Sequence, residues 1–500
     1  MNRLANNVSI LLASLLTSAA LAEYTPGVEA WNIESAPPQQ TLVVRDATVW
    51  TAAEDGILEQ ADLLVRDGEI RAVGVDLDAP GNALEIDGAG MHVTPGIIDA
   101  HSHAAIIGGV NEATDISTAQ VRIQDVIDSE SINIYRQLAG GVTAINLLHG
   151  SANAIGGQMA VIKMRWGASP EELIFDAAAP GIKFALGENP KQSNWSNDDP
   201  RYPQSRPGVA QVIEEKFEQA VDYQRKLEEM PQGRRGRDAV PPRPDLEMDA
   251  IVEILEGVRK IHSHAYRADE MVMLINIAES FGVTIGTFQH VLEGYKLARR
   301  MAEHGAGGSG FIDWWNFKHE ASDAIPYNPA LMAMGGVTVG LHSDNPELAR
   351  RMNLEAAKAV RYGGVDEHDA LIMITANPAR QLGVGDRTGR LERGLDADFV
   401  IWNGHPLSVY TRVEQTWVDG RRYFDREADR AQREALEAER RELIAMVLEA
   451  DRDEGAPDDD SEEETPGWLI GYRASELAHD EFCHAQDFGH VHAIDFRSGE

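Results

Sequence analysis

Short apolar runs alternate with helix-like stretches through the middle of the chain. In the helix-like stretches apolar residues recur every three or four positions, whereas the strand-like runs are short and continuous. The predicted strands cover residues 97–100, 142–148, 159–164, 182–186, 258–262, 283–288 and 337–341. The predicted helices cover residues 119–139, 209–229 and 291–303. This alternation predicts an α/β fold, a TIM-like (β/α)8 barrel over residues 95–388.

The segments on either side of this region predict strands joined by tight turns. Residues 41–94 hold β-rich runs separated by turns such as Asp67-Gly68, and residues 389–424 repeat the style with Asp419-Gly420. Because the two stretches are alike, we expect both ends of the chain to build one small antiparallel domain, a composite β-sandwich, beside the barrel.

Two segments fit neither domain. Residues 187–249 form a long, Pro- and Arg-rich insertion around one predicted helix, and such connections are either lids or disordered. The tail, residues 425–500, starts with a charged helix at 426–452, continues through an acidic linker and ends with four histidines near Cys483. A second metal site there is one interpretation, but the irregular spacing favours exposed or packed histidines.

The chain is strongly acidic, with a formal net charge of −36. No basic surface is available to neutralise phosphates, which argues against nucleic acid and anionic membranes as partners. We interpret the acidity as an aid to solubility. The single cysteine, Cys483, excludes a disulfide within the chain.

The first 22 residues predict an export signal. Arg3 supplies a short positive region, an apolar run follows from Val8 to Leu21, and Ala20-Leu21-Ala22 resembles a cleavage site. A membrane anchor would need a longer apolar span. We therefore expect a mature protein that is periplasmic or secreted and has no membrane attachment once the signal is cleaved.

Two histidines end the first strand of the predicted barrel, in Pro-Gly-Ile-Ile-Asp-Ala-His-Ser-His at residues 95–103. In an extended chain residues two apart share a face, so His101 and His103 point the same way and can bind one metal ion. The alternative is a pair of polar strand-end residues without a metal.

Other predicted strands of the barrel also end in side chains that can bind a metal ion. Lys183 follows Ile182, and Asp344 follows Gly-Leu-His-Ser after the last strand. The remaining strand-end groups are His262 and His264 in Ile-His-Ser-His and His290 in Thr-Phe-Gln-His. Closure of a barrel brings such strand ends to one face, so these residues are expected to share a site.

These motifs, together with the closing Gly-Leu-Asp-Ala-Asp-Phe-Val-Ile-Trp at residues 394–402, resemble the metal-dependent amidohydrolase superfamily. Within it the chain is similar to the imidazolonepropionase-like branch, which includes exported amidases and dipeptidases. The resemblance spans residues 41–424. The export signal, the insertion and the tail lie outside it.

The resemblance implies a set of metal ligands. The first-strand histidines His101 and His103, with Asp344, would bind the more buried metal ion. Lys183, carboxylated by CO2, would bridge to a second ion. Histidines ending strands five and six complete that second site. They are His264 on the fifth strand, with His262 as the alternative there, and His290 on the sixth.

The resemblance further implies a hydrolase that cleaves a C–N bond of an amide, a dipeptide or an N-acyl amino acid. Zn2+ would generate hydroxide, and Asp344 would act as general base and then general acid. If Lys183 stays unmodified, the alternative is a mononuclear hydrolase of cyclic amides or a deaminase of imidazolonepropionase type. A non-catalytic barrel that binds a metal or ligand is the third hypothesis.

Substrate contacts are the least specified part of the site. The candidates follow predicted strands, and an Arg or Lys among them would pair with a substrate carboxylate. They are His149, Tyr266, Arg267, Trp315 and Lys318. The expected partner is a small molecule, and association into a homo-oligomer is left open.

Overall fold

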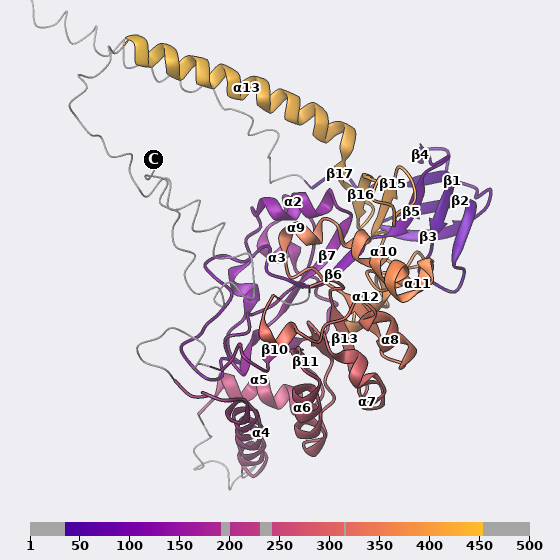
Figure 1. The fold of residues 1–500 in the computed structure, drawn as a ribbon. Coiled ribbons are helices and arrows are strands. Elements are labelled where there is room, and N and C mark those ends of the chain that lie inside the picture. Colours follow the sequence, from indigo (N-terminus) through magenta and orange to yellow (C-terminus); the bar gives the residue numbers. More distant parts are fainter. Residues whose placement is uncertain (1–35, 192–200, 231–242, 315–316, 454–500) are drawn as a thin grey trace, which may run out of the picture. The chain divides into compact units, whose positions relative to one another are not determined.

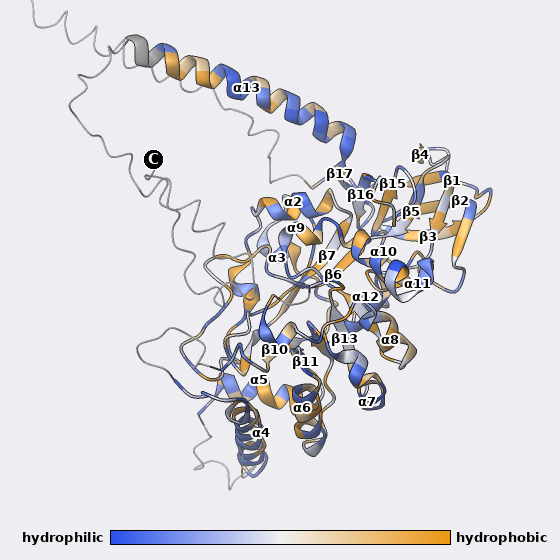
Figure 2. Ribbon diagram, in the orientation of Figure 1, coloured by the Kyte–Doolittle hydropathy of each residue, from blue (hydrophilic) through white to orange (hydrophobic). Residues whose placement is uncertain are grey.

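The computed structural model describes residues 36–191, 201–230, 243–314 and 317–453 (Figure 1). Residues 36–425 belong to one compact unit, and the helix α13 (Arg426–Asp453) belongs to another. Helix α13 covers the predicted charged helix, and Figure 2 shows hydrophilic residues along most of its length.

Some predictions fall outside the described residues. These are the export signal at 1–22, the acidic linker, and the histidines near Cys483. None of the helices that are described is both long and apolar enough to cross a membrane.

Both ends of the 36–425 unit contribute to one eight-stranded sheet. Its order is β17-β16-β15-β5-β1-β2-β3, with β4 beside β1. The central seam joins β5 to β15 in antiparallel register, with Val93 opposite Ile401. The strands are β1 (Leu42–Trp50), β2 (Ile57–Arg66), β3 (Glu69–Gly74), β4 (Leu84–Asp87), β5 (His92–Pro95), β15 (Phe399–Trp402), β16 (Val413–Val418) and β17 (Arg421–Asp425).

Alternate residues of this sheet are buried together. Val44, Leu63 and Val93 belong to the same hydrophobic cluster as Phe399 and Trp417. The last two are opposite each other in register, and their rings stack with centroids 5.5 Å apart. Val400 and Trp402, which alternate with Phe399 on β15, belong instead to the larger cluster of the central strands, so the sheet shared by both chain ends is buried on both faces at β15. Its division into the two layers of a sandwich stays a prediction.

The predicted turns of this sheet have the expected backbone. Asp67 and Gly68 have φ of 57° and 77°, and Asp419 and Gly420 have φ of 51° and 68°. Positive φ at both central residues is typical of the type I′ turns that join antiparallel strands, and Asp-Gly is a preferred sequence for them.

The central strands form two further sheets. A six-stranded sheet has the order β14-β13-β12-β11-β10-β8, and a three-stranded sheet has the order β6-β7-β9. The strands are β6 (Ile97–Ser102), β7 (Val142–Leu147), β8 (Ile155–Gln158), β9 (Ala160–Lys163), β10 (Gly181–Ala185), β11 (Lys260–His264), β12 (Thr287–Gln289), β13 (Gly307–Gly310) and β14 (Val339–Leu341).

Strands β8 and β9 differ from the prediction of one strand at 159–164. They are separated only by Met159, and they run antiparallel to β10 and β7, respectively. This segment therefore links the two sheets. The opposite edge strands of the two sheets are β14 and β6. They are also linked, because the backbone N–H of Asp344, beyond β14, donates to the carbonyl of His101 on β6 at 3.0 Å.

Helices and 3-10 turns connect the central strands. The 3-10 turns are η2 (Ile123–Val126), η5 (Gly294–Lys296) and η6 (His319–Ala321). The helices are α2 (Ile132–Leu138), α3 (Pro170–Leu173), α4 (Arg206–Glu228), α5 (Leu246–Leu255), α6 (Ala268–Ser280), α7 (Ala298–His304), α8 (Asn328–Met334), α9 (Pro346–Ala349), α10 (Met352–Gly363), α11 (Glu367–Ile372) and α12 (Ala376–Gln381).

Two predicted helices are shorter than expected. The helix predicted at 119–139 is only η2 and α2, because Ile127 between them forms an extended bridge with Ile106. The helix predicted at 291–303 is reduced to η5 and α7, because the chain after β12 first makes a loop in which Glu293 accepts the backbone N–H of Ala268. Tertiary hydrogen bonds have overridden the helical pattern in both places.

The described part of the 187–249 insertion is packed. Helix α4 buries Val212, Ile213 and Phe217. The ring of Phe217 lies 6.1 Å from that of Phe184 on β10 and 5.2 Å from that of Phe281 after α6. Helix α4 is therefore part of the hydrophobic core rather than a lid or a disordered segment.

Candidate metal centre

The end of β6 is fixed by a buried carboxylate. Asp99 accepts the backbone N–H groups of His101 at 3.2 Å and Ser343 at 3.0 Å, and also the Ser343 hydroxyl. Ser343 follows β14, so this carboxylate ties the two strand ends together. Burial raises the pKa of Asp99 to about 6, against the opposing effect of the Ser343 hydrogen bonds.

Asp344 lies at the centre of a group of imidazoles. Its Oδ1 atom is 3.4 Å from His103 Nε2 and 3.5 Å from His101 Nε2, and its Oδ2 atom is 3.7 Å from His290 Nε2. All four side chains are buried. The structure therefore brings together, from three separate strand ends, residues that are up to 243 positions apart in sequence.

The ring of His103 is oriented by its other nitrogen. Its Nδ1 atom lies 2.9 Å from the carbonyl oxygen of Leu148, and a carbonyl only accepts hydrogen bonds. Nδ1 therefore carries a proton that it donates to Leu148, and Nε2 is the nitrogen that faces Asp344. This is the arrangement by which proteins orient metal-binding imidazoles.

Lys183 and His264 adjoin this group. Lys183 Nζ on β10 lies 3.3 Å from His101 Nε2, and the ring centroid of His264 on β11 lies 4.9 Å from that of His290. His262 lies two residues before His264 on β11, and its Nδ1 atom is 3.3 Å from the side-chain amide of Gln289. The structure thus puts His264, the favoured candidate, against the group.

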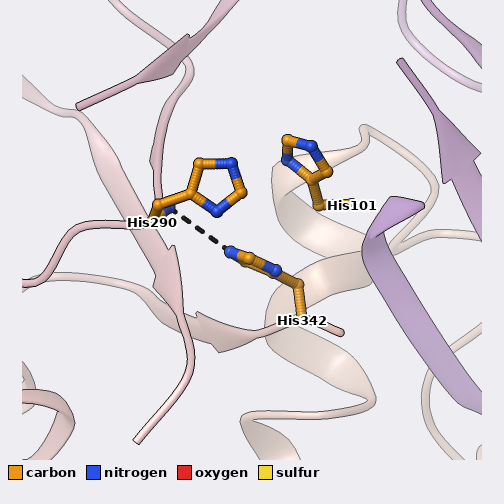
Figure 3. Close-up of side chains that lie close together, drawn as sticks. All are labelled: His101, His290 and His342. Carbon is orange, nitrogen blue, oxygen red and sulfur yellow. Dashed lines mark hydrogen bonds between the residues drawn. The ribbon is translucent and has the colours of Figure 1, made fainter. Parts of the chain in front are cut away.

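A further imidazole, His342, was not among the predicted ligands. It follows β14, and its ring centroid is 4.7 Å from that of His290 and 5.1 Å from that of His101 (Figure 3). Ring nitrogens of these three residues lie within 4.8 Å of one another. The available sequence signal was its place in Gly-Leu-His-Ser-Asp, directly after the last predicted strand and two residues before Asp344.

Burial sets the charge of these imidazoles. It lowers the pKa of His101, His290 and His342 well below the ordinary value, and neighbouring positive groups add to the effect. The three rings are therefore neutral at physiological pH, the form in which imidazole binds a metal ion.

Of the predicted substrate contacts, Tyr266 lies against the imidazoles, and Lys318 lies against Tyr266. The ring of Tyr266 is 4.6 Å from that of His264. Lys318 Nζ lies 4.8 Å from the centre of the Tyr266 ring and donates to Asn189 Oδ1 at 2.7 Å.

The other candidates have different surroundings. His149 Nδ1 donates to the carbonyl of Gly150 at 2.9 Å, and Nε2 accepts the backbone N–H of Glu112 at 2.8 Å, so both nitrogens bind the backbone. Arg267 is ion-paired with Asp269 at 3.0 Å. Trp315 is outside the described residues.

A cluster of charged residues that the sequence did not predict joins three strand-end loops. Arg206, at the start of α4, contacts the carboxylates of Glu270 and Glu320, and its Nη2 atom is 3.6 Å from Glu188 Oε1. The three acids follow β11, β13 and β10, respectively. Burial, reinforced by the charge of Glu270, raises the pKa of Glu320 to about 7.

Comparisons with known proteins agree with this geometry. The model of the amidohydrolase family matches residues 92–423. A solved amidohydrolase from Thermotoga maritima is 34% identical, with a TM-score of 0.71, over 77% of this chain and 100% of that one.

Two curated relatives cover a similar part of the chain. The amidohydrolase tasK of Hapsidospora irregularis is 30% identical over 77% of this chain, but the match spans only 43% of that longer protein. An imidazolonepropionase of Anaeromyxobacter dehalogenans is 24% identical over 73% of this chain and 90% of its own length. The chain therefore has a TIM-barrel-like mixed α/β fold, and it belongs to the amidohydrolase family.

Proposed function

We propose that this protein is a zinc-dependent hydrolase that cleaves a C–N bond in an amide, a dipeptide or an N-acyl amino acid. One observation carries the proposal. The Nε2 atoms of His101 and His103 lie 3.5 Å and 3.4 Å from the same carboxylate oxygen of Asp344, and the ligand atoms of these three buried side chains lie within 4.8 Å of one another, close enough to bind one metal ion.

The donor set fits a divalent metal ion. Imidazole nitrogens and carboxylate oxygens are common zinc ligands, and burial lowers the pKa of His101 and His290, which favours the neutral form that binds a metal ion. We assign His101, His103 and Asp344 to a first metal ion. We assign His264 and His290 to a second, and carboxylated Lys183 would be a ligand of both.

When bound, the metal ions would supply Lewis acidity and lower the pKa of water towards neutrality. Asp344 would accept a proton from the attacking water and return it to the leaving amine. The hydrogen bond from its backbone N–H to the His101 carbonyl helps to fix its carboxylate among the imidazoles. The Nδ1–H bond of His103 to Leu148 fixes that ring in the same way.

We propose that Lys183 is carboxylated. Its amine would add to CO2 and lose a proton, which leaves an anionic carbamate. Lys183 is fully buried, and its Nζ lies 3.3 Å from His101 Nε2. An anionic oxygen ligand there would stabilise two metal ions, whereas an ammonium group would repel them.

A mononuclear centre is the second candidate. Its support is the similarity to imidazolonepropionases over most of their length. In that case Lys183 stays an amine, and the reaction is hydrolysis of a cyclic amide or a deamination.

We propose Tyr266 and Lys318 as substrate contacts. Both follow strands that also supply, or lie beside, the imidazole group, and the Lys318 ammonium would pair with a substrate carboxylate. His149 is better explained as support for the 111–115 segment, because its ring binds the backbone. Arg267 and Trp315 stay predictions.

The finer architecture and location are also proposals. We infer that the six- and three-stranded sheets are arcs of one (β/α)8 barrel over 95–388, because the β8–β9 segment pairs with both of them. We infer that residues 41–94 and 389–424 form a companion domain. Export through the predicted signal at 1–22 is testable by fractionation of the producing cell.

The first experiment is metal analysis of the full-length protein. Purified without chelator, it should contain zinc, and hydrolysis of a panel of N-acyl amino acids, dipeptides and cyclic amides should be lost with chelator and restored by Zn2+. Folded protein with well under one metal ion per chain, even after zinc addition, would contradict the proposal. If the metal-replete protein hydrolyses none of these substrates, a non-catalytic binding role is favoured.

The second experiment separates one metal from two. Lys183→Ala should lose one of two metal ions and most activity if Lys183 is the bridging ligand. Lys226→Ala, on the exposed side of α4, is the matched control and should change neither. Retention of full metal content and activity by Lys183→Ala would support the mononuclear alternative.

A further inference from the structure

We propose that His342 is a positioning residue, which holds the backbone of His290 in the conformation that aims its imidazole at Asp344, and that His342 is not itself a metal ligand. This inference rests on the metal centre proposed above. It assigns a role to the one imidazole of Figure 3 that the predicted ligand set leaves out.

The backbone of His290 is unusual. Its φ of 57° is in the left-handed region, which residues with a side chain adopt at a cost in free energy. The turn takes the chain out of β12 and is accompanied by a hydrogen bond from the Leu292 N–H to the His290 carbonyl at 2.7 Å. With this turn, His290 Nε2 lies 3.7 Å from Asp344 Oδ2.

His342 binds the other backbone polar group of His290. The N–H of His290 donates to His342 Nε2 at 3.3 Å, the dashed line in Figure 3. A buried backbone N–H without an acceptor would be costly. The imidazole of His342 therefore compensates for part of the strain at His290.

The same hydrogen bond excludes His342 as a ligand in this arrangement. Its Nε2 lone pair is directed at the His290 N–H and is not available to a metal ion. The proton of the neutral ring is then on Nδ1, so this nitrogen has no lone pair to give. Nδ1 is buried without a hydrogen-bond partner among the described residues, so the bond at Nε2 is the one that orients the ring.

Glutamine and asparagine at position 342 form a matched pair. In His342→Gln the amide reaches the place of Nε2 and can accept the His290 N–H. In His342→Asn the amide is one methylene shorter and reaches only the place of Nδ1. Both variants are polar and lack an imidazole, so they differ chiefly in this hydrogen bond.

We expect His342→Asn to weaken zinc affinity about 10- to 100-fold, the usual effect of losing a group that orients a ligand. His342→Gln should stay close to the unmodified protein. The visible spectrum of Co2+-loaded protein should keep its shape in both variants, because the ligands are unchanged. His304→Asn is the control, because His304 Nε2 accepts the Ile285 backbone N–H at 3.0 Å outside the metal centre.

Other results would overturn the inference. Equal loss of zinc affinity in both variants, with an altered Co2+ spectrum, would make His342 a direct ligand. An unchanged affinity in His342→Asn would exclude a positioning role.

Crystal structures of the metal-free variants give a readout that is independent of the proposed function. His290 should keep its positive φ in His342→Gln and lose it in His342→Asn, and retention in both would overturn the inference. Failure of the unmodified protein to bind any metal would instead contradict the proposed function.

Discussion

Replacement of Lys163 by Met should destabilise the protein strongly. Lys163, at the end of β9, is fully buried, and its Nζ lies 2.7 Å from Asp396 and 3.0 Å from Asp398 and also contacts Asp419. These aspartates flank the strands of the composite sheet. The ammonium group therefore holds the sheet of the chain ends to the central strands.

The loss of unfolding free energy can be estimated from the buried carboxylates that Lys163→Met leaves without a counter-charge. Methionine has nearly the volume of lysine, so the main effect is the loss of charge. Burial raises the pKa of Asp398, and Lys163 opposes that rise, so without Lys163 this carboxylate is left without its main counter-charge. Breaking a buried ion pair from one side costs about 3–5 kcal/mol. Arg165 and Arg387, which pair with Asp419 and Asp396, favour the lower end of this range.

The assay is urea unfolding followed by tryptophan fluorescence and circular dichroism at several pH values. The loss in Lys163→Met should shrink as the pH falls, because protonation removes the uncompensated negative charge. Arg350→Ala, which breaks an exposed pair with Glu347, is the control and should cost under about 1 kcal/mol. A loss in Lys163→Met no larger than in this control, or one independent of pH, would refute the reasoning.

Three further predictions concern other parts of the protein. The pKa of Glu320 is raised from 4.5 to about 7, so the unmodified protein should lose up to roughly 3 kcal/mol of stability as the pH rises through this range, and Glu320→Gln should not. Urea midpoints at pH 5 and pH 8 test this, and an equal difference between the two proteins at both pH values would contradict it. Gly96→Ala should cost about 1–3 kcal/mol in unfolding experiments, because its Cβ would lie 2.0 Å from Thr143 Oγ1, whereas Gly81→Ala, in open space, should be nearly neutral. Zinc at 100 times its dissociation constant should raise the unfolding free energy by about 2.7 kcal/mol over chelated protein, and no shift in the thermal midpoint would argue against a bound metal.

Several features follow from local sequence alone. The apolar run before His101 predicts a buried strand, and the two-residue spacing to His103 predicts that both imidazoles share a face. The Asp-Gly pairs at residues 67 and 419 predict tight turns between antiparallel strands. Each of these depends on residues close together in the chain, so periodicity and backbone preference suffice.

Other features depend on contacts between distant residues. His290 and Asp344 have a left-handed backbone, and although His and Asp adopt it more readily than most residues with a side chain, the residue type alone does not predict it at these two positions. The antiparallel pairing of β8 and β9 and the contacts of Arg206 with three glutamates likewise require partners from other elements.

The sequence by itself therefore determined the strand ends, the residue types at them and the family resemblance. Only the tertiary structure decided that Asp344 faces His101 and His103, that His342 supports His290, and that Lys163 is surrounded by three aspartates. The physical reason is that apolar periodicity is a local property of the chain, whereas hydrogen bonds and buried charges are satisfied by groups that meet only after folding.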